Sequence, residues 1–182
     1  MTDTSTRVAE LRPHVGEVRE DIVAVSEALW NLNELGLNEF ESVKTVKEML
    51  VSHGFAITSD GTGGLATAFL AEFGSGEPVL AILGEYDALP ALGNNAVPRQ
   101  EPRDDGQTSG HGCGHNLIAS GSVGAAIALR YWLEQTGTPG TIRYAGCPAE
   151  ETDNGKVPMA LAGAFDGVAA AIHWHPGDRA AV

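Results

Sequence analysis

Seven residues in the second half of the chain combine metal-binding side chains with glycines that permit tight turns. Residues 110–116 read Gly-His-Gly-Cys-Gly-His-Asn. Cysteine thiolate and imidazole are the usual protein ligands for zinc and related divalent ions. Cys113 and His115 are two residues apart, so in an extended loop their side chains point the same way. A helix predicted from Asn116 would lower the pKa of the Cys113 thiol through its positive end. On spacing alone, a small-residue turn with a buried cysteine and surface histidines fits this stretch equally well.

Further candidate ligands occur at three other places, each directly after a predicted apolar strand. They are the pairs Glu85 and Asp87, Glu150 and Glu151, and His173 and His175. The carboxyl ends of strands in α/β sheets are where such folds hold ligands. Each pair alone has a structural explanation, such as a solvated surface pair or a turn residue. The joint pattern nevertheless favours a metal site at one edge of a sheet.

The chemistry of these side chains fits a two-metal hydrolase. Cys113, His115 and a carboxylate would hold ions that polarise a carbonyl and acidify water. Of Glu150 and Glu151, one would bind metal and the other would move a proton from water to the leaving amine. In an extended segment the two side chains diverge, which would separate these roles. The sequence has no HExxH helix and no GxSxG elbow, so zincins and serine hydrolases are not supported.

The elements that must position these side chains follow from apolar spacing. Helices are predicted near 15–35, from an Asn38–Glu41 capping box to His53, and near 116–135 and 157–164. Strands are predicted at 55–58, 65–73, 78–84, 141–146 and 168–173, with a turn at 74–76 joining the second and third. This alternation predicts the α/β class, as a three-layer α/β/α sandwich with a mixed, mostly parallel sheet.

Composition restricts the class of partner. The 182 residues carry a formal net charge of -13, which argues against nucleic acid and against a membrane surface as partners. Two cysteines do not make a disulfide framework, so a cytoplasmic location is expected. The first ten residues lack the apolar core of a signal peptide, and no run approaches the length of a membrane span.

Three ordered motifs resemble a known family. They are residues 112–116 (Gly-Cys-Gly-His-Asn), residues 146–151 (Gly-Cys-Pro-Ala-Glu-Glu) and residues 174–176 (Trp-His-Pro). Together they resemble the clan MH metallopeptidase-type amidohydrolases, and most closely the branch of aminobenzoyl-glutamate utilisation protein B. Hippurate hydrolases, auxin-conjugate hydrolases and aminoacylase-like proteins are relatives. The resemblance extends from the Leu35-Gly36-Leu37-Asn38-Glu39 segment to the end of the chain.

The resemblance implies specific roles for the candidate residues. Glu150 would be the general base, and Asp87 the carboxylate that supports a ligand from behind. Two divalent ions, Zn²⁺ or Mn²⁺, are implied. The implied metal ligands are Cys113, His115, Glu151 and His175, with His173 as the alternative to His175 because relatives differ in the form of the last motif.

The resemblance also implies an organisation and an activity. Residues 1–182 correspond to the N-terminal portion of a catalytic domain, and the lid or dimerisation domain and the C-terminal catalytic half of the family are expected to be absent from them. The whole protein is expected to form homodimers or hetero-oligomers. It would cleave the amide bond of N-acyl amino acids or dipeptides, with aminobenzoyl-glutamate as the model substrate. The alternative is a non-catalytic metal-binding or subunit-interaction module, and these residues alone are expected to be inactive.

Overall fold

The apolar runs of the sequence form a five-stranded sheet in the computed structural model, which describes residues 4–178. In spatial order the strands are β1 (Ala56–Asp60), β2 (Phe69–Ser75), β4 (Gly140–Cys147), β3 (Val79–Glu85) and β5 (Val168–Ile172). β3 is parallel to β4 and β5, whereas β2 is antiparallel to β1 and β4. The predicted mixed sheet is confirmed, although parallel pairings are half of the total rather than most of it.

β2 and β3 are consecutive in the chain but are not neighbours in the sheet. The sequence predicts that the turn at 74–76 joins adjacent strands, yet β4 lies between them. Its register pairs Gly146 with Phe69 of β2, and Cys147 with Glu85 of β3. The physical reason lies in β3, which is apolar along its length. Such a strand suits an interior position with a partner on each side and helices over its faces.

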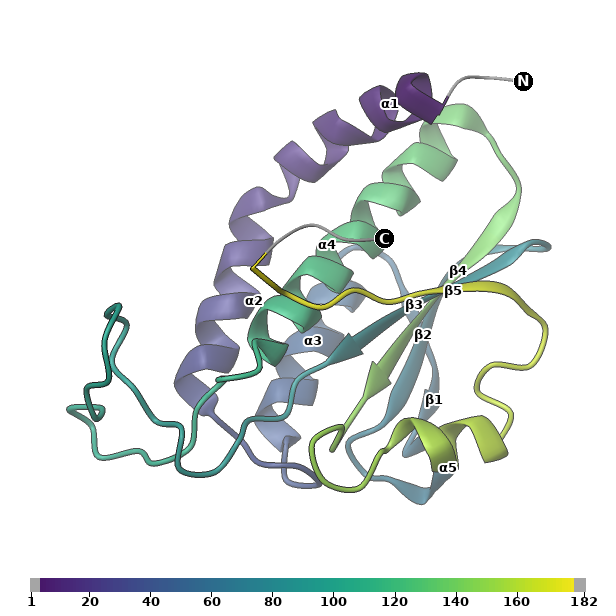
Figure 1. Cartoon of the computed structure of the whole chain (residues 1–182). Helices are drawn as coiled ribbons and strands as arrows, with labels where there is room; N and C mark the ends of the chain where they lie inside the picture. The colour runs from purple at the N-terminus through teal and green to yellow at the C-terminus, as the bar shows by residue number, and fades with distance from the viewer. Residues whose placement is uncertain (1–3, 179–182) are drawn as a thin grey trace.

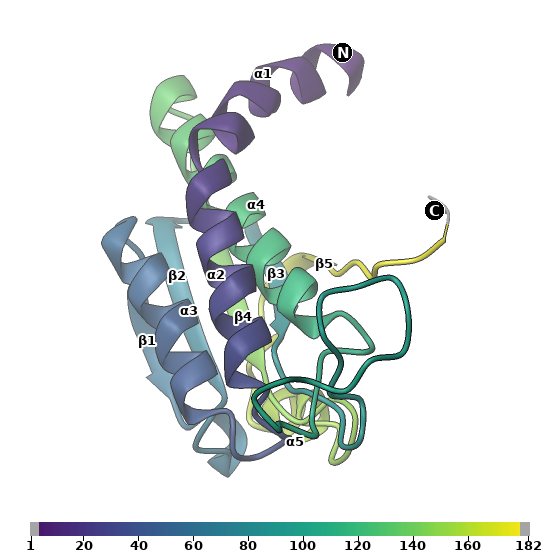
Figure 2. The same ribbon diagram turned by 90° about the vertical axis from the view of Figure 1, so that its left-hand side faces the viewer.

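Helices cover both faces of the sheet (Figures 1 and 2). α2 (Arg19–Leu32), α3 (Phe40–Ser52) and α4 (His115–Thr136) lie on one face, α1 (Thr4–Glu17) packs against α4, and the short α5 (Lys156–Leu161) lies on the other. Alternate strand residues serve the two cores, because successive side chains of a strand point to opposite faces. Ile82 and Tyr144 pack with α2 to α4, whereas Leu83 and Ala145 pack with Met159 of α5. This is the predicted three-layer arrangement.

The N-terminal helical region is divided, whereas the pattern near 15–35 predicts one helix. α1 ends at Glu17 and α2 begins at Arg19. Val18 lies between them, is 2% exposed and belongs to the core. Gly16 precedes the break, and its weak helix propensity favours a break at this place. α2 also ends earlier than Gly36 would predict, because Asn33 adopts a left-handed conformation with φ 49°.

The start of α3 is held by a carboxylate outside the predicted capping box. The Asn38 side-chain amide donates to the Gly36 carbonyl, and α3 has no side-chain cap at its N-cap position, which is Glu39. Glu34 instead accepts hydrogen bonds from the backbone N–H groups of Glu41 and Ser42, at 3.1 and 2.7 Å. The prediction of an Asn38 cap is therefore wrong. A four-residue motif cannot reveal this cap, because Glu34 lies further back in the chain.

The far edge of the sheet is apolar and uncovered. Residues 169–172 of β5 are all exposed, Ile172 by 54%, and Trp174 just after the strand is 41% exposed. Parallel strands are normally covered on both faces. Ile172 and Trp174 therefore form an apolar surface of this chain. Among residues 4–178, no helix has the length and apolar character that crossing a membrane requires.

Two buried tyrosines give opposite predictions for stability. The Tyr144 hydroxyl lies over Gly84 and has no hydrogen-bond partner among residues 4–178, whereas Tyr86 donates to the Thr67 carbonyl. A buried polar group without a partner costs about 1–3 kcal/mol, and a typical hydrogen bond contributes about 1 kcal/mol net. We expect Tyr144→Phe to keep or raise the free energy of unfolding and Tyr86→Phe to lower it by about 1 kcal/mol. Urea unfolding tests this, and a Tyr144→Phe variant less stable than Tyr86→Phe would contradict it.

Candidate metal centre

The carboxyl ends of β3, β4 and β5 meet at one edge of the sheet because these strands run parallel. From this edge the chain continues into the segments that carry Asp87, Glu150 and His175. The first residue of α4, His115, contacts Asp87 at the same edge. The structure thus brings together side chains from all four candidate groups of the sequence.

His115 is the centre of the cluster. Its side chain is 1% exposed, and its Nδ1 lies 2.9 Å from Asp87 Oδ1. The other Asp87 oxygen accepts a hydrogen bond from the backbone N–H of Glu151 at 3.0 Å. A carboxylate at Nδ1 keeps the proton there and leaves Nε2 with a free lone pair, the form in which imidazole binds metals. Asp87 therefore sets both the orientation and the tautomer of His115.

Carboxylates crowd the free nitrogen of His115. The distances from Nε2 to the nearest carboxylate oxygens are 3.5 Å for Glu85, 3.7 Å for Glu150 and 3.8 Å for Glu151. Burial lowers the pKa of His115, but Asp87, Glu85 and Glu151 outweigh it and raise that pKa above its usual value. Burial raises the pKa of Asp87, but the hydrogen bonds from His115 and Glu151 outweigh it and lower that pKa. The surrounding carboxylates therefore favour a positive charge next to Nε2, whether a proton or a bound cation.

Cys113 and His175 complete one group of candidate ligands. Cys113 Sγ lies 3.1 Å from His175 Nε2, and His175 Nδ1 lies 2.8 Å from the Pro176 carbonyl, which fixes the proton on Nδ1. One ligand atom each from Cys113, His115 and His175 lie within 4.8 Å of one another. Thiolate and imidazole donors at such separations suit zinc and similar ions.

The thiol of Cys113 does not behave as its position near a helix start predicts. Burial raises its pKa to about 11, helped by the neighbouring Glu151, Glu150 and Glu85. The helix begins at His115, one residue before its predicted start, with Gly114 as its N-cap. Negative charge nearby thus outweighs the helix end, and the expected lowering of the pKa is wrong for the protein without a cation. A thiolate here requires a positive ion beside it.

Glu85 defines a second group, which separates the two competing histidines. Glu85 is 2% exposed, and ligand atoms of Glu85, His115 and Glu150 also lie within 4.8 Å of one another. His173 Nε2 lies 3.2 Å from Glu85 Oε1, and His173 does not belong to the cluster of ligand atoms formed by Cys113, His115 and His175. His175 and His173 therefore occupy different places, the first beside the thiol and the second beside Glu85.

Glu150 and Glu151 lie in a turn rather than in an extended segment. The turn spans residues 150–153 and follows Ala149, which has a left-handed φ of 52°. Their side chains do not diverge as predicted, because both carboxylates come within 4 Å of His115 Nε2. The Glu150 side chain is 36% exposed and that of Glu151 is 19% exposed. Backbone geometry alone thus leaves both within reach of the same ion.

The unsatisfied atoms of the cluster fit a divalent cation. His115 Nε2 and Glu151 Oε1 are buried and have no hydrogen-bond partner within the described part of the chain. Buried polar groups without partners are rare in native proteins, and buried charges are normally paired or bind metals. Thiol, imidazole and carboxylate donors converge here. The residues present therefore fit one or more divalent ions.

Sequence patterns miss two charged residues that the structure brings to this region. Lys156, the first residue of α5, pairs with Glu85. Glu39 is fully buried beside the Glu150 turn, where it accepts a hydrogen bond from the Ala149 amide. Neither stands in a motif with chemical meaning, since Lys156 resembles a surface helix residue and Glu39 a polar helix start.

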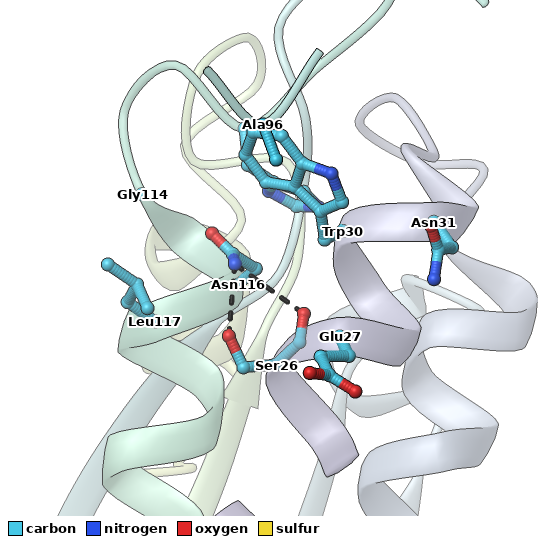
Figure 3. Close-up of a pocket in the computed structure, with 9 residues that line it drawn as sticks. Ser26, Glu27, Trp30, Asn31, Ala96, Gly114, Asn116 and Leu117 are labelled. Carbon is cyan, nitrogen blue, oxygen red and sulfur yellow. Dashed lines mark hydrogen bonds between the residues drawn. The ribbon is translucent and has the colours of Figure 1, made fainter. Parts of the chain in front are cut away.

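A pocket of about 460 Å³ adjoins the ligand-bearing loop (Figure 3). It lies between α2 and the beginning of α4, and Trp30, Leu117 and Gly114 contribute to its wall. Asn116 donates its side-chain amide to the hydroxyl of Ser26 at 3.1 Å, which links the two helices across the pocket. Trp30 and Leu117 offer an apolar surface next to the candidate metal centre.

Comparison with known families and proteins points to one group of hydrolases. The model of peptidase family M20/M25/M40 matches residues 81–181. One of the subunits of the p-aminobenzoyl-glutamate hydrolase of Escherichia coli (strain K12) is 43% identical over 158 residues, which are 87% of this chain and 33% of that protein. The Xaa-Arg dipeptidase of Mus musculus is 34% identical over 181 residues, covering 89% of this chain and 36% of that protein. The chain thus spans about a third of the length of these curated relatives.

Solved structures have a similar fold. A Bacillus subtilis dinuclear metal binding peptidase from the M20 family superposes with a TM-score of 0.72 at 26% identity, covering 86% of this chain and 42% of that one. The aminobenzoyl-glutamate utilization protein from Klebsiella pneumoniae superposes with a TM-score of 0.62 at 19% identity, covering 90% of this chain and 46% of that one.

Proposed function

The chain belongs to peptidase family M20/M25/M40, and we propose that the whole protein is a metal-dependent amidohydrolase that acts on N-acyl amino acids or small peptides. One observation carries the proposal. His115 Nε2 is buried and has no hydrogen-bond partner among residues 4–178. It faces three carboxylates within 4 Å and lies beside Cys113 and His175. A divalent ion is the ligand that satisfies all of these groups at once.

The proposed ligands are the residues that converge on His115. Cys113, His175 and Glu151 would hold an ion with it, and Glu85 offers oxygen atoms for a second, whereas Glu150 would remain available for proton transfer. His115 belongs to both groups, but its one free nitrogen binds a single ion, so the second ion would rely on carboxylates. Mixed sulfur, nitrogen and oxygen donors suit zinc, and a carboxylate-rich site also suits manganese. We propose two ions, of zinc or manganese.

A divalent ion at this site supplies Lewis acidity, which polarises the amide carbonyl and acidifies water. The residues of the chain do the rest. Glu150 has the more exposed of the two adjacent carboxylates, so it is the better placed to take a proton from water and deliver it to the leaving amine. Asp87 keeps the proton of His115 on Nδ1 throughout.

The substrate class rests on the relatives. The Escherichia coli relative is named as part of a p-aminobenzoyl-glutamate hydrolase and the mouse relative as an Xaa-Arg dipeptidase. The test is release of free amino acid from 4-aminobenzoyl-glutamate, from N-acyl amino acids and from dipeptides by the whole protein. We expect hydrolysis of at least one class, lost after chelation and recovered with added metal. No hydrolysis of any class by folded, metal-loaded protein would refute the proposal.

The uncovered apolar edge at Ile172 and Trp174 favours a second candidate, a metal-binding module for subunit interaction. Metal binding without hydrolysis would support it.

The name of the Escherichia coli relative marks it as one subunit of a larger enzyme, so we propose that the whole protein forms a homodimer or hetero-oligomer, which light scattering would measure. Cys113 and Cys147 are both free, which supports the proposed cytoplasmic location.

The two histidines near the end of the chain provide a matched pair of variants. We expect His175→Ala to weaken metal binding strongly, because it removes an imidazole from the group with Cys113 and His115. His173→Ala is expected to have a smaller effect, since it removes only a partner of Glu85. Competition with a chelator measures both affinities. If His173→Ala caused the larger loss, the assignment of the two histidines would be reversed.

A further inference from the structure

Glu39 is a buried carboxylate that lies behind the candidate metal centre. It stands between α2 and α3, and its side chain is fully buried. One oxygen accepts a hydrogen bond from the Ala149 backbone N–H at 2.7 Å, and the other accepts one from the Thr67 hydroxyl at 2.9 Å. A buried carboxylate is costly unless it is well hydrogen-bonded, so these two contacts account for how it is accommodated.

The contact with Ala149 supports an unusual backbone conformation directly before Glu150, the proposed base, and Glu151, a proposed metal ligand. Ala149 is fully buried and has a φ of 52°, in the left-handed region that non-glycine residues rarely adopt. Its carbonyl accepts from the Asp153 N–H at 3.0 Å, which closes the turn that carries Glu150 and Glu151. Glu39 holds the first amide of this turn. A strained conformation of this kind persists only where its surroundings fix it.

The segment that contains Glu39 also contacts the other side of the centre. The Ala88 N–H, next to Asp87, donates to the Glu34 carbonyl at 2.8 Å. A side chain at Gly36 would meet Thr152 Oγ1 at 2.6 Å and Ala149 at 3.1 Å, so the backbone packs directly on the turn. Residues 34–39 therefore connect the Asp87 segment with the Glu150 turn, two parts of the site that are far apart in sequence.

We propose that Glu39 is a positioning residue of the metal centre: through the Ala149 amide it sets the place of Glu150 and Glu151 relative to His115. This rests on the proposed function, since it concerns the same site. Glu39 touches neither His115 nor any proposed ligand side chain in the contacts that the structure records for it. Its effect must pass through the backbone of the turn.

Two substitutions of similar size separate the roles of Glu39. Glu39→Gln keeps an oxygen for the Ala149 N–H and places an amide beside the Thr67 hydroxyl, so it retains both contacts. Glu39→Met fills the space but accepts no hydrogen bond. We expect Glu39→Met to lower metal affinity or turnover by about 10-fold or more, as loss of a residue that supports a metal ligand does. Glu39→Gln should keep values close to those of the parent, the unsubstituted protein. Turnover should fall more than KM rises, because the turn carries the proposed base.

Thr67→Val is the control for a merely structural role. It removes the second contact of Glu39 but leaves the bond to Ala149 intact, so it should lower stability without changing metal affinity. Should Glu39→Met fail to fold, Glu39→Asp serves in its place, because it draws the carboxylate back from Ala149 by one methylene. Chelator competition, steady-state kinetics and urea unfolding of the whole protein are the measurements.

The outcomes distinguish this inference from the proposed function. If the parent binds metal and hydrolyses its substrate while folded Glu39→Met and Glu39→Asp match it, Glu39 has no positioning role. If Thr67→Val and Glu39→Met reduce affinity equally, the effect is general destabilisation and the inference is again overturned. If the parent itself neither binds a divalent ion nor hydrolyses an amide, the proposed function fails.

Discussion

In the whole protein, Glu150→Gln should lower the turnover of amide hydrolysis by at least about 100-fold, the low end of what a general base contributes. Glutamine has the same shape but cannot accept the proton from water. Metal content should stay nearly unchanged, because Glu151, Cys113 and the histidines remain. Steady-state kinetics on an N-acyl amino acid and metal analysis of the same sample measure the two effects.

Glu151→Gln is the matched control, since it changes the neighbouring residue in the same way. We expect it to weaken or lose a metal, with activity partly restored by excess ion. Loss of metal in Glu150→Gln together with full metal content in Glu151→Gln would reverse the two assignments. Ligand atoms of Glu150, Glu85 and His115 lie within 4.8 Å of one another, so Glu150 is close enough to bind metal if the roles are reversed. Unchanged turnover in both variants would defeat the hydrolase mechanism.

Loss of a residue that supports a metal ligand typically lowers metal affinity about 10–100-fold. We expect Cys113→Ser to lower it further, because Cys113 is itself a proposed ligand. A neutral hydroxyl replaces a thiolate, and it cannot match the charge or softness of sulfur. The thiol has a pKa of about 11 without a cation, so metal binding must displace its proton. The affinity of the parent should therefore rise with pH, and this rise should be weaker in Cys113→Ser.

Cys147→Ser is the control for this prediction. Cys147 is a free, fully buried cysteine at the end of β4, and its Sγ contacts the Ala145 carbonyl at 3.4 Å. Its replacement should affect stability and leave metal affinity nearly unchanged. Equal loss of affinity in the two variants would indicate that Cys113 acts through the fold and is not a ligand. Chelator competition across a range of pH provides the readout.

The sequence predicts the fold class and the positions of its strands because apolar periodicity is a local signal. β3 and β4 begin and end within one residue or so of their predicted bounds, and α4 within one residue. Apolar periodicity does not reveal features that depend on contacts outside the segment itself. Two such features are the insertion of β4 between β2 and β3 and the capping of α3 by Glu34.

The residues of the site also divide into those that local motifs reveal and those whose contacts are distant in sequence. Cys113, His115 and Asp87 can be found because they stand in short motifs at element ends, and the structure brings them together. Glu85 is visible as a strand-end carboxylate, but its pairing with Lys156 is not, since 71 residues separate them. Glu39 acts on a turn 110 residues further along the chain, and such a contact leaves no pattern in the sequence.

Metal content and its link to hydrolysis test the central claim most directly. The whole protein should retain two divalent ions per chain after dialysis, and a chelator should remove them together with amide hydrolysis while circular dichroism still reports a folded protein. Added zinc or manganese should restore the activity. A folded protein that holds no divalent ion after dialysis, or that hydrolyses its substrate at the same rate in the presence of chelator, would contradict the account.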